Sequence, residues 1–248
     1  MEDRLSRMRL MVGEKGLKTL KKSHVCVVGC GAVGGFAVEA LARAGIGHLS
    51  LIDFDTVGIS NINRQILALH STLNQKKVDV AKARISDIAP EIKVDTYDLL
   101  INQKTVQTLV DLKPDFVVDA IDSLNPKVCL IETLVKNKIP FVSCMGAALK
   151  TKPNLIQVEK MKKTKNDPLA AFIRKYLRRR GIDLNFSVVY SPELVQDKSK
   201  LALPESVPEK GRTRHQMGSL PTITGIFGLT CAQVVLDYLL TSSNKTIS

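Results

Sequence analysis

The stretch from Val25 to Gln65, "VCVVGCGAVGGFAVEALARAGIGHLSLIDFDTVGISNINRQ", decides the fold. It opens with an apolar run, passes through Gly29-x-Gly31-x-x-Gly34 into an amphipathic helix, and returns to a second apolar run that ends at Asp53. A buried strand, a glycine turn and a helix in this order are the context that a nucleotide-binding βαβ unit requires. The sequence therefore predicts a parallel sheet with a phosphate-binding turn after its first strand.

The same alternation of strands and helices continues as far as residue 146. Further strands are predicted at "KVDTYDLL", "DFVVDAID" and "PFVSCMG", with helices between them. This pattern predicts an α/β fold built on a doubly wound, mostly parallel, Rossmann-like sheet. A basic helix over 4–22 precedes the sheet, and a C-terminal α+β extension over 147–248 follows it. We expect one domain over 1–248, with its core at 24–146 and a mobile polar loop at 194–219.

The charge balance favours an anionic partner. The 248 residues carry 36 Lys+Arg against 24 Asp+Glu, a net charge of +12. Such an excess is typical of proteins that bind nucleic acid or a membrane surface. The cations are densest in the helix predicted after Asp167, at Arg174, Lys175, Arg178, Arg179 and Arg180.

The apolar tract Leu220–Leu240 is interrupted by Pro221, Gln233 and Asp237. It predicts a packed core or dimer helix rather than a membrane span, and leaves peripheral membrane contact open. The charged N-terminus is not a secretory signal.

The five cysteines are scattered and form no CxxC pair. This spacing excludes a four-thiolate zinc site and argues against a disulfide framework, so we expect a reducing, cytoplasmic location. Cys144, at a strand end near the predicted site, is interpreted as a packed thiol.

Polar residues follow the second strand, at the edge where open α/β sheets bind ligands. An acidic residue at Asp53 accepts hydrogen bonds from ribose hydroxyls, and Asp55 is a second candidate if the strand continues. Up to this point NAD and ATP fit equally well.

The "NINRQ" segment favours ATP. A triphosphate carries more charge than a dinucleotide pyrophosphate, and attack at its α-phosphorus needs cations on the leaving group. Arg64 and Lys77 supply such cations, although Lys77 alone would be read as a solvated helix lysine. Asn61 either holds the loop or bonds a phosphate.

The "DAIDSLNPK" segment follows the fourth strand and offers a metal ligand. Asp122 lies beyond the apolar run, where a carboxylate can hold the Mg²⁺ of ATP. Asp119, at the strand end, is interpreted as a capping residue.

Five motifs in order over residues 4–146, "RLSR", "VVGCGAVGG", "LIDFDTVGISNINRQ", "KKV" and "DAIDS", resemble the adenylating enzymes related to ubiquitin activators. The molybdopterin- and thiamine-pathway adenylyltransferases belong to this group. The resemblance implies ATP-dependent activation of a carboxylate. It assigns Gly29, Gly31 and Gly34 to the nucleotide, Asp53 to the ribose, Asn61, Arg64 and Lys77 to the phosphates, and Asp122 to Mg²⁺. It also makes Arg7 an arginine finger that reaches into the neighbouring subunit of a homodimer.

The second half of the chain, with "DPLAAFIRKYLRRRGI", "VVYSPE" and "GSLPTITGIFG", is similar to the tRNA threonylcarbamoyladenosine dehydratases. In that group ATP activates a carboxylate on a modified tRNA adenosine, and an internal nucleophile closes a ring. The resemblance implies a tRNA substrate, and the Arg174–Arg180 cluster would supply phosphate contacts. Some members have a cysteine before the final helix, but "GRTRHQMGS" has none, which leaves a sulfur-relay partner open.

Three other functions fit the sequence less well. An adenylyltransferase for a sulfur-carrier or ubiquitin-like protein usually carries two CxxC pairs, which are missing here. A nucleotide-binding scaffold without catalysis has no need of leaving-group cations. An NAD(P) oxidoreductase leaves "NINRQ" and "RLSR" unexplained.

Overall fold

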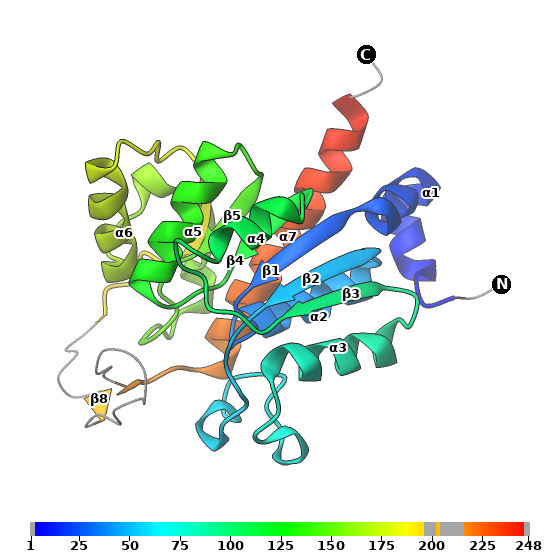
Figure 1. Ribbon diagram of the computed structural model, residues 1–248, viewed down its shortest axis with the longest axis horizontal. Coiled ribbons are helices and arrows are strands. Elements are labelled where there is room, and N and C mark those ends of the chain that lie inside the picture. Colours follow the sequence, from blue (N-terminus) through cyan, green and yellow to red (C-terminus); the bar gives the residue numbers. More distant parts are fainter. Residues whose placement is uncertain (1–2, 196–201, 204–215, 246–248) are drawn as a thin grey trace.

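The fold is the predicted α/β class, built on a seven-stranded sheet of order β3-β2-β1-β4-β5-β7-β6 (Figure 1). The computed structural model describes residues 3–195, 202–203 and 216–245. All neighbouring strands are parallel except β6, which is antiparallel to β7. The strands are β1 (His24–Val28), β2 (His48–Ile52), β3 (Lys93–Tyr97), β4 (Phe116–Asp119), β5 (Phe141–Cys144), β6 (Gln157–Lys160) and β7 (Ser187–Tyr190).

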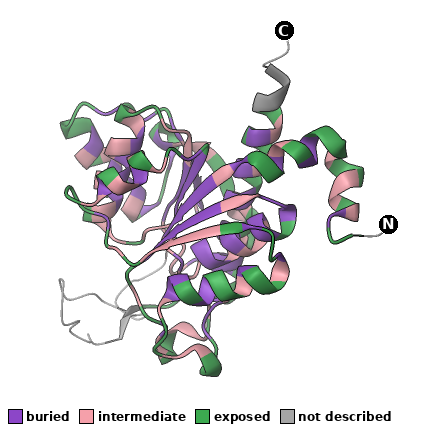
Figure 2. Ribbon diagram, turned by 45° about the vertical axis from the view of Figure 1, so that its right-hand side comes forward, coloured by how far each residue is buried: buried purple, intermediate pink, exposed green. Residues whose placement is uncertain are grey.

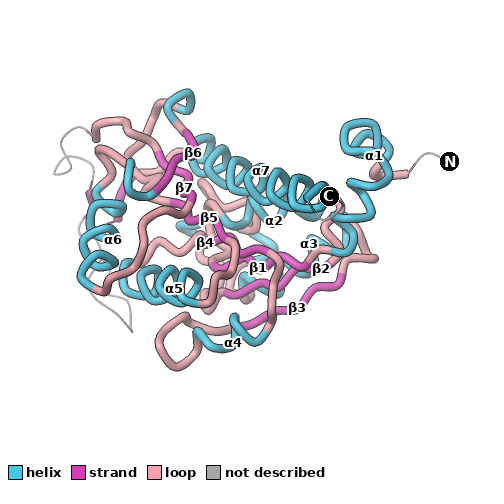
Figure 3. Tube along the Cα trace, turned by 90° about the horizontal axis from the view of Figure 1, so that it is seen from above, coloured by secondary structure: helices cyan, strands magenta, loops and turns pink. Residues whose placement is uncertain are grey.

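Helices cover both faces of the sheet, as Figure 3 shows from above. The helices are α1 (Ser6–Lys22), α2 (Gly34–Ala44), α3 (Lys77–Ile88), α4 (Val106–Asp111), α5 (Leu124–Lys136), α6 (Pro168–Arg179) and α7 (Pro221–Lys245). α2 and α7 lie on one face, and α4 and α5 lie on the other. The central strands are buried between them, and the outward faces of the helices are exposed (Figure 2). This arrangement explains the nearly continuous apolar runs of β1, β4 and β5.

Residues after 146 complete the sheet. β7 pairs with β5, and β6 forms the outer edge. α6 begins as predicted, because an Asp167 carboxylate oxygen accepts a hydrogen bond from the Ala170 amide at 2.8 Å. Gly181, with φ of +69°, follows its end. Most of the loop predicted at 194–219 lies outside the described residues, but Ala202–Leu203 (β8) pairs with Gln216–Met217 (β9).

α7 packs as a core helix. By length and composition Pro221–Thr241 could cross a membrane, but half of that window is buried inside the protein. Phe227, Cys231 and Val235 are fully buried. A Cβ at Gly228 would lie 2.3 Å from the Val33 carbonyl oxygen, so the backbones of α7 and of the turn before α2 are in close contact. The apolar residues of α7 are therefore explained by its packing in the protein core.

A buried ion pair joins β4, α5 and β5. Lys127 Nζ on α5 lies 2.9 Å from an Asp119 carboxylate oxygen, and both side chains are 0% exposed. Ser143 Oγ on β5 donates to the same carboxylate at 2.6 Å. The other Asp119 oxygen accepts from the Ile121 amide at 3.2 Å, which is the capping role predicted from the sequence. No motif in the sequence marks Lys127 as the buried partner of Asp119.

We expect Lys127→Met to lower the free energy of unfolding by about 3–5 kcal/mol, because it leaves a buried carboxylate without its cation. Urea denaturation measures the loss. The double variant Asp119→Asn/Lys127→Met should recover part of it, since neither buried charge remains. A loss below about 1 kcal/mol in the single variant would show that the pair is not a major stabilising contact.

Candidate nucleotide-binding site

The candidate site lies at the carboxyl ends of β1, β2 and β4. The Gly29 amide donates to the Ile52 carbonyl at 2.8 Å, and the Ala120 amide donates to the Val28 carbonyl at 2.9 Å. These bonds bring the glycine turn, the end of β2 and the turn after β4 together. β1 and β4 are also the strands between which the sheet order reverses. Open α/β sheets bind their ligands at this switch point.

Two of the three predicted glycines are required by the fold. Gly29 has φ of +92°, and a Cβ there would lie 2.8 Å from the Ala120 carbonyl oxygen. A Cβ at Gly34 would lie 1.7 Å from the Gly29 carbonyl oxygen, which no side chain can occupy. The turn therefore closes only with glycine at both positions.

Gly31 differs from the other two glycines. A Cβ at Gly31 would meet only the Gln65 amide nitrogen, at 3.9 Å. Packing within the chain therefore does not demand glycine, whereas close approach of a ligand to the backbone would. No side chain caps the N-terminus of α2, which follows directly. No capping side chain therefore competes for the backbone amides of the first turn of α2, and an anion can accept hydrogen bonds there.

Asp53 ties the end of β2 to the glycine turn. Its carboxylate accepts from the Cys30 amide at 2.6 Å and from the Asp55 amide at 2.8 Å. Burial raises the pKa of Asp53, and the nearby positive charge of Lys77 opposes that rise. These two backbone amides therefore hold the Asp53 carboxylate at the carboxyl edge of the sheet, next to the glycine turn.

Lys77 is fixed by an acidic partner rather than solvated, so the solvated-lysine interpretation was wrong. It is the first residue of α3, its side chain is 6% exposed, and its Nζ lies 2.7 Å from an Asp55 carboxylate oxygen. β2 ends at Ile52, so Asp55 lies in the following loop instead of continuing the strand. Asp55 thus positions the cation.

The "NINRQ" segment begins in a short 3₁₀ helix, Ile59–Asn61. The Asn61 side-chain oxygen accepts from the Gly58 amide at 3.1 Å, so it holds the loop. The Arg64 guanidinium donates to the Ser60 carbonyl and to the Asn63 side chain, both at 2.8 Å. These hydrogen bonds to neighbouring residues of the same loop fix the orientation of the Arg64 side chain.

Gln65 is a candidate site residue that was not predicted from the sequence. It is buried, and its Oε1 is the one buried side-chain oxygen or nitrogen in the described part of the chain that has no hydrogen-bond partner. Its Nε2 is the atom nearest the open side of Gly31. An unpaired buried polar atom costs free energy unless a ligand or water satisfies it. The only sequence signal was its position directly after Arg64.

Asp122 lies in the turn between β4 and α5. Its carboxylate accepts from Ser123 Oγ at 3.0 Å, and the preceding Ile121 carbonyl accepts from Lys127 Nζ at 2.9 Å. The buried lysine therefore supports the turn that carries Asp122. Across the described residues, no group of three or more His, Cys, Asp or Glu side chains could hold a metal ion by itself.

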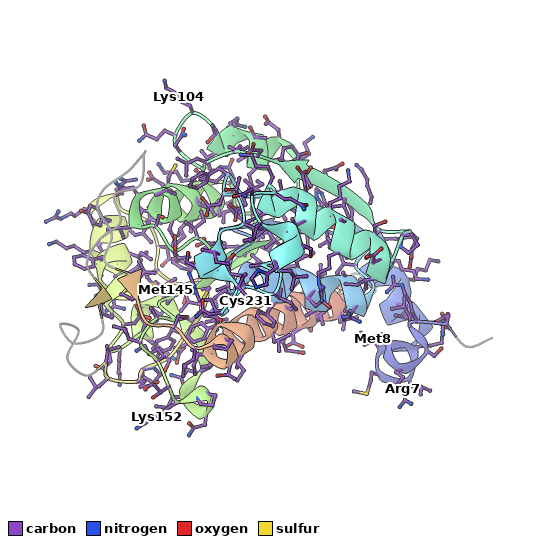
Figure 4. All side chains as sticks on the ribbon, turned by 90° about the horizontal axis from the view of Figure 1, so that it is seen from below. Arg7, Met8, Lys104, Met145, Lys152 and Cys231 are labelled. Atoms are coloured by element: carbon purple, nitrogen blue, oxygen red, sulfur yellow. The ribbon has the colours of Figure 1, made fainter. Side chains whose placement is uncertain are left out.

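Arg7 is not brought to this site within one chain. It is exposed on the first half of α1, which a kink at Gly13, with φ of +67°, separates from the second half. The neighbouring Arg4 donates to the Ala42 carbonyl at 3.2 Å, near the end of α2 and so at the opposite edge of the sheet. Figure 4 shows Arg7 at the periphery, far from Met145 and Cys231.

The five cations predicted for tRNA contact do not form one patch. The Arg174 guanidinium, partly buried, donates to Thr164 Oγ1. Arg180 pairs with Glu132 of α5 at 2.5 Å. The other three side chains are exposed on α6: Lys175, Arg178 and Arg179.

Cys144 is buried at the end of β5 and its thiol donates to the Met145 carbonyl at 3.3 Å. It lies against Cys231 of α7, and their hydrogen bond together with burial raises the pKa of Cys231 well above its usual range. Both thiols are packed groups in this structure.

Comparison with known proteins identifies the family and the relatives that the chain resembles. The model of the ThiF family matches residues 3–248. The chain is 45% identical, over 76% of its length and 74% of the relative's, to the tRNA threonylcarbamoyladenosine dehydratase of Bacillus subtilis. It is 35% identical to the Escherichia coli protein of that name, covering 95% of this chain and 92% of the relative. The crystal structure of the Escherichia coli dehydratase, TcdA, in complex with ATP matches with a TM-score of 0.87 at 33% identity, covering 98% of this chain and 96% of that one.

The two kinds of glycine should respond differently to alanine. Gly34→Ala should prevent folding, because its Cβ would collide with the Gly29 carbonyl. Gly31→Ala should keep the wild-type urea midpoint and weaken ATP binding about tenfold or more, because only a ligand approaches that face. Isothermal calorimetry with ATP measures the second effect. Wild-type ATP affinity in a folded Gly31→Ala protein would contradict the assignment of this turn.

Proposed function

The chain belongs to the ThiF family, and we propose that it is an ATP-dependent tRNA threonylcarbamoyladenosine dehydratase. It would activate the carboxylate of the modified adenosine, after which an internal nucleophile of the modification closes a ring with net loss of one water. The observation that carries this proposal is the edge formed by Gly31, Gln65, Lys77 and Arg64. There an open glycine backbone and an unpaired buried amide oxygen occur together with two cations: Lys77, whose charge acts on Asp53 and Cys30, and Arg64, which precedes Gln65 in the chain.

The residues at this edge fit ATP. The open side of Gly31 admits a phosphate to the backbone, and the N-terminus of α2 offers amides to it. Asp53 would accept ribose hydroxyls, and Arg64 and Lys77, together with the amide group of Asn61, would contact the phosphates. The ion pair with Asp55 fixes the position of the Lys77 ammonium group. A bound phosphate would then share this ammonium group with Asp55. Gln65 gains a partner for its Oε1 in the bound state.

Mg²⁺ would be held by Asp122. Enzymes commonly bind Mg²⁺ through one or two carboxylates completed by ATP phosphates and water. The buried Lys127 donates to the Ile121 carbonyl and so supports the turn that carries Asp122.

A homodimer would supply Arg7. Within one chain this arginine lies at the opposite edge of the sheet from the phosphates. Leu10 and Met11, on the same half of α1, are 87% and 83% exposed, and a partner subunit would cover them. We propose that α1 of one subunit carries Arg7 to the site of the other, where it stabilises charge on the leaving phosphates.

A tRNA substrate agrees with the net charge of +12. The alternative is an adenylyltransferase for a sulfur-carrier or ubiquitin-like protein, which needs no such excess of cations.

All five cysteines are free, as expected for a protein of the reducing cytoplasm.

The function is tested by incubating the protein with ATP, Mg²⁺ and tRNA that carries threonylcarbamoyladenosine, followed by mass spectrometry of the nucleosides. We expect the modified nucleoside to lose the mass of one water only when ATP is present. An unchanged nucleoside, with pyrophosphate exchange that appears only when a carrier protein is added, would favour the adenylyltransferase instead.

Arg64→Ala and Asp122→Ala should each lower turnover by about 100-fold or more while keeping the wild-type unfolding midpoint, because both side chains act on the phosphates and neither belongs to the core. The control is Arg43→Ala, an exposed arginine in the last turn of α2, which should keep turnover near the wild-type value. Full activity in both test variants would refute the phosphate and metal assignments.

Subunit mixing tests the dimer. A 1:1 mixture of Arg7→Ala and Arg64→Ala subunits, each inactive alone, should recover roughly a quarter of the wild-type activity. Half of the dimers are then mixed, and each mixed dimer has one complete site. If mixing after subunit exchange restores nothing, Arg7 does not act across the interface.

A further inference from the structure

A groove of about 580 Å³ runs along the outer strand of the sheet. One wall is the segment 162–165, with Lys162, Lys163 and Lys165, and the other is the β6–β7 pair, with Gln157, Glu159 and Tyr190. No function was predicted here from the sequence, because the groove forms only when β6 pairs with β7.

The groove is cationic. Glu159 is the one carboxylate in its lining, and it lies 3.7 Å from Lys163 Nζ. Lys162 and Lys165 are exposed, and neither has an ion-pair partner among the residues that the structure describes. Two lysine charges are thus left uncompensated beside a polar wall, which is an arrangement suited to a polyanion.

The groove is continuous with the cations of α6. Arg174 donates to Thr164 Oγ1, in the groove wall, and so links the helix to the segment 162–165. Arg178 lies four residues after Arg174 on α6 and therefore on the same side of the helix. Burial first, and then the charge of Arg178, lower the pKa of Arg174. Lys175 lies three residues before Arg178 and therefore on the same side of the helix. Arg180 turns away to α5.

The groove leads to the edge of the sheet that carries the candidate nucleotide site. The Lys162 amide donates to the Leu184 carbonyl, before β7 begins, at 3.1 Å. The Asn166 side chain donates to the Pro192 carbonyl, beyond the end of β7, at 3.0 Å. β7 is parallel to β5, so its carboxyl end lies at the edge of the nucleotide site. There Asp167 accepts from the Gly146 amide at 3.0 Å.

We propose that this groove binds the sugar–phosphate backbone of the RNA substrate and guides it toward the nucleotide site. The inference rests on the proposed function, which supplies the RNA. β6 is four residues long and spans roughly 13 Å at ~3.3 Å per residue. One strand of a duplex carries about four phosphates over that length. Lys162, Lys163 and Lys165 are spread along it, and Arg178 and Lys175 extend the surface onto α6.

The test is the triple variant Lys162→Gln/Lys163→Gln/Lys165→Gln of the full chain. Its control is Lys22→Gln/Lys82→Gln/Lys138→Gln, which removes the same charge from three exposed lysines outside the groove. Binding of tRNA is measured over a range of salt concentrations, and binding of ATP is measured without tRNA. We expect the slope of log affinity against log salt to become shallower by about two to three in the groove variant. The control should keep the wild-type slope, and both variants should bind ATP like the wild type.

Equal salt slopes in the groove variant and the control would overturn the inference, while turnover of modified tRNA by the wild type would leave the proposed function standing. If the groove variant loses affinity equally for tRNA and for polyglutamate, the groove is a general polyanion surface and the inference also fails. Lack of any ATP-dependent change in the tRNA nucleoside with the wild type would instead reject the proposed function.

Discussion

Backbone contact at the carboxyl edge of the sheet is the constraint on which the candidate site depends. The carbonyl of Gly29 occupies the place that a side chain at Gly34 would need, and the carbonyl of Ala120 occupies the place of one at Gly29. The turn after β1, the first turn of α2 and the turn after β4 can therefore pack directly on one another. This contact brings polar groups that follow three different strands to one place at the edge of the sheet, where open α/β sheets bind ligands.

Much of the charge around the site serves to place other charges. Asp53 is bonded to two backbone amides, Asp55 holds Lys77, and Lys127 supports the turn of Asp122 while paired with Asp119. Groups fixed in this way need not reorganise when a triphosphate enters, which is the condition for strong electrostatic stabilisation. The unpaired Oε1 of Gln65 is the exception, since its bonding is left incomplete by the chain itself.

The cations of the C-terminal extension are divided by their packing. Arg180 is tied to α5, and Arg174 reaches into the wall of the groove beside β6. A run that looks uniform in sequence thus contributes to two separate faces of the molecule. Helical geometry alone places Arg174, Lys175 and Arg178 on one side, but only the pairing of β6 with β7 adds the lysines of 162–165 to that surface.

The sequence by itself determined the sheet, the glycine turn and most of the polar residues at its edge. Those signals are local: apolar runs, glycine spacing, and Asp53, Arg64 and Asp122 just after predicted elements. It also determined the capping of α6 by Asp167, whose bond spans three residues. Only the tertiary structure decided that Lys127 is buried, that Gln65 faces Gly31 and that Arg7 lies at the far edge. These facts depend on contacts between segments that are distant in sequence, and their side chains look the same in a linear chain whether they end in solvent or in the core.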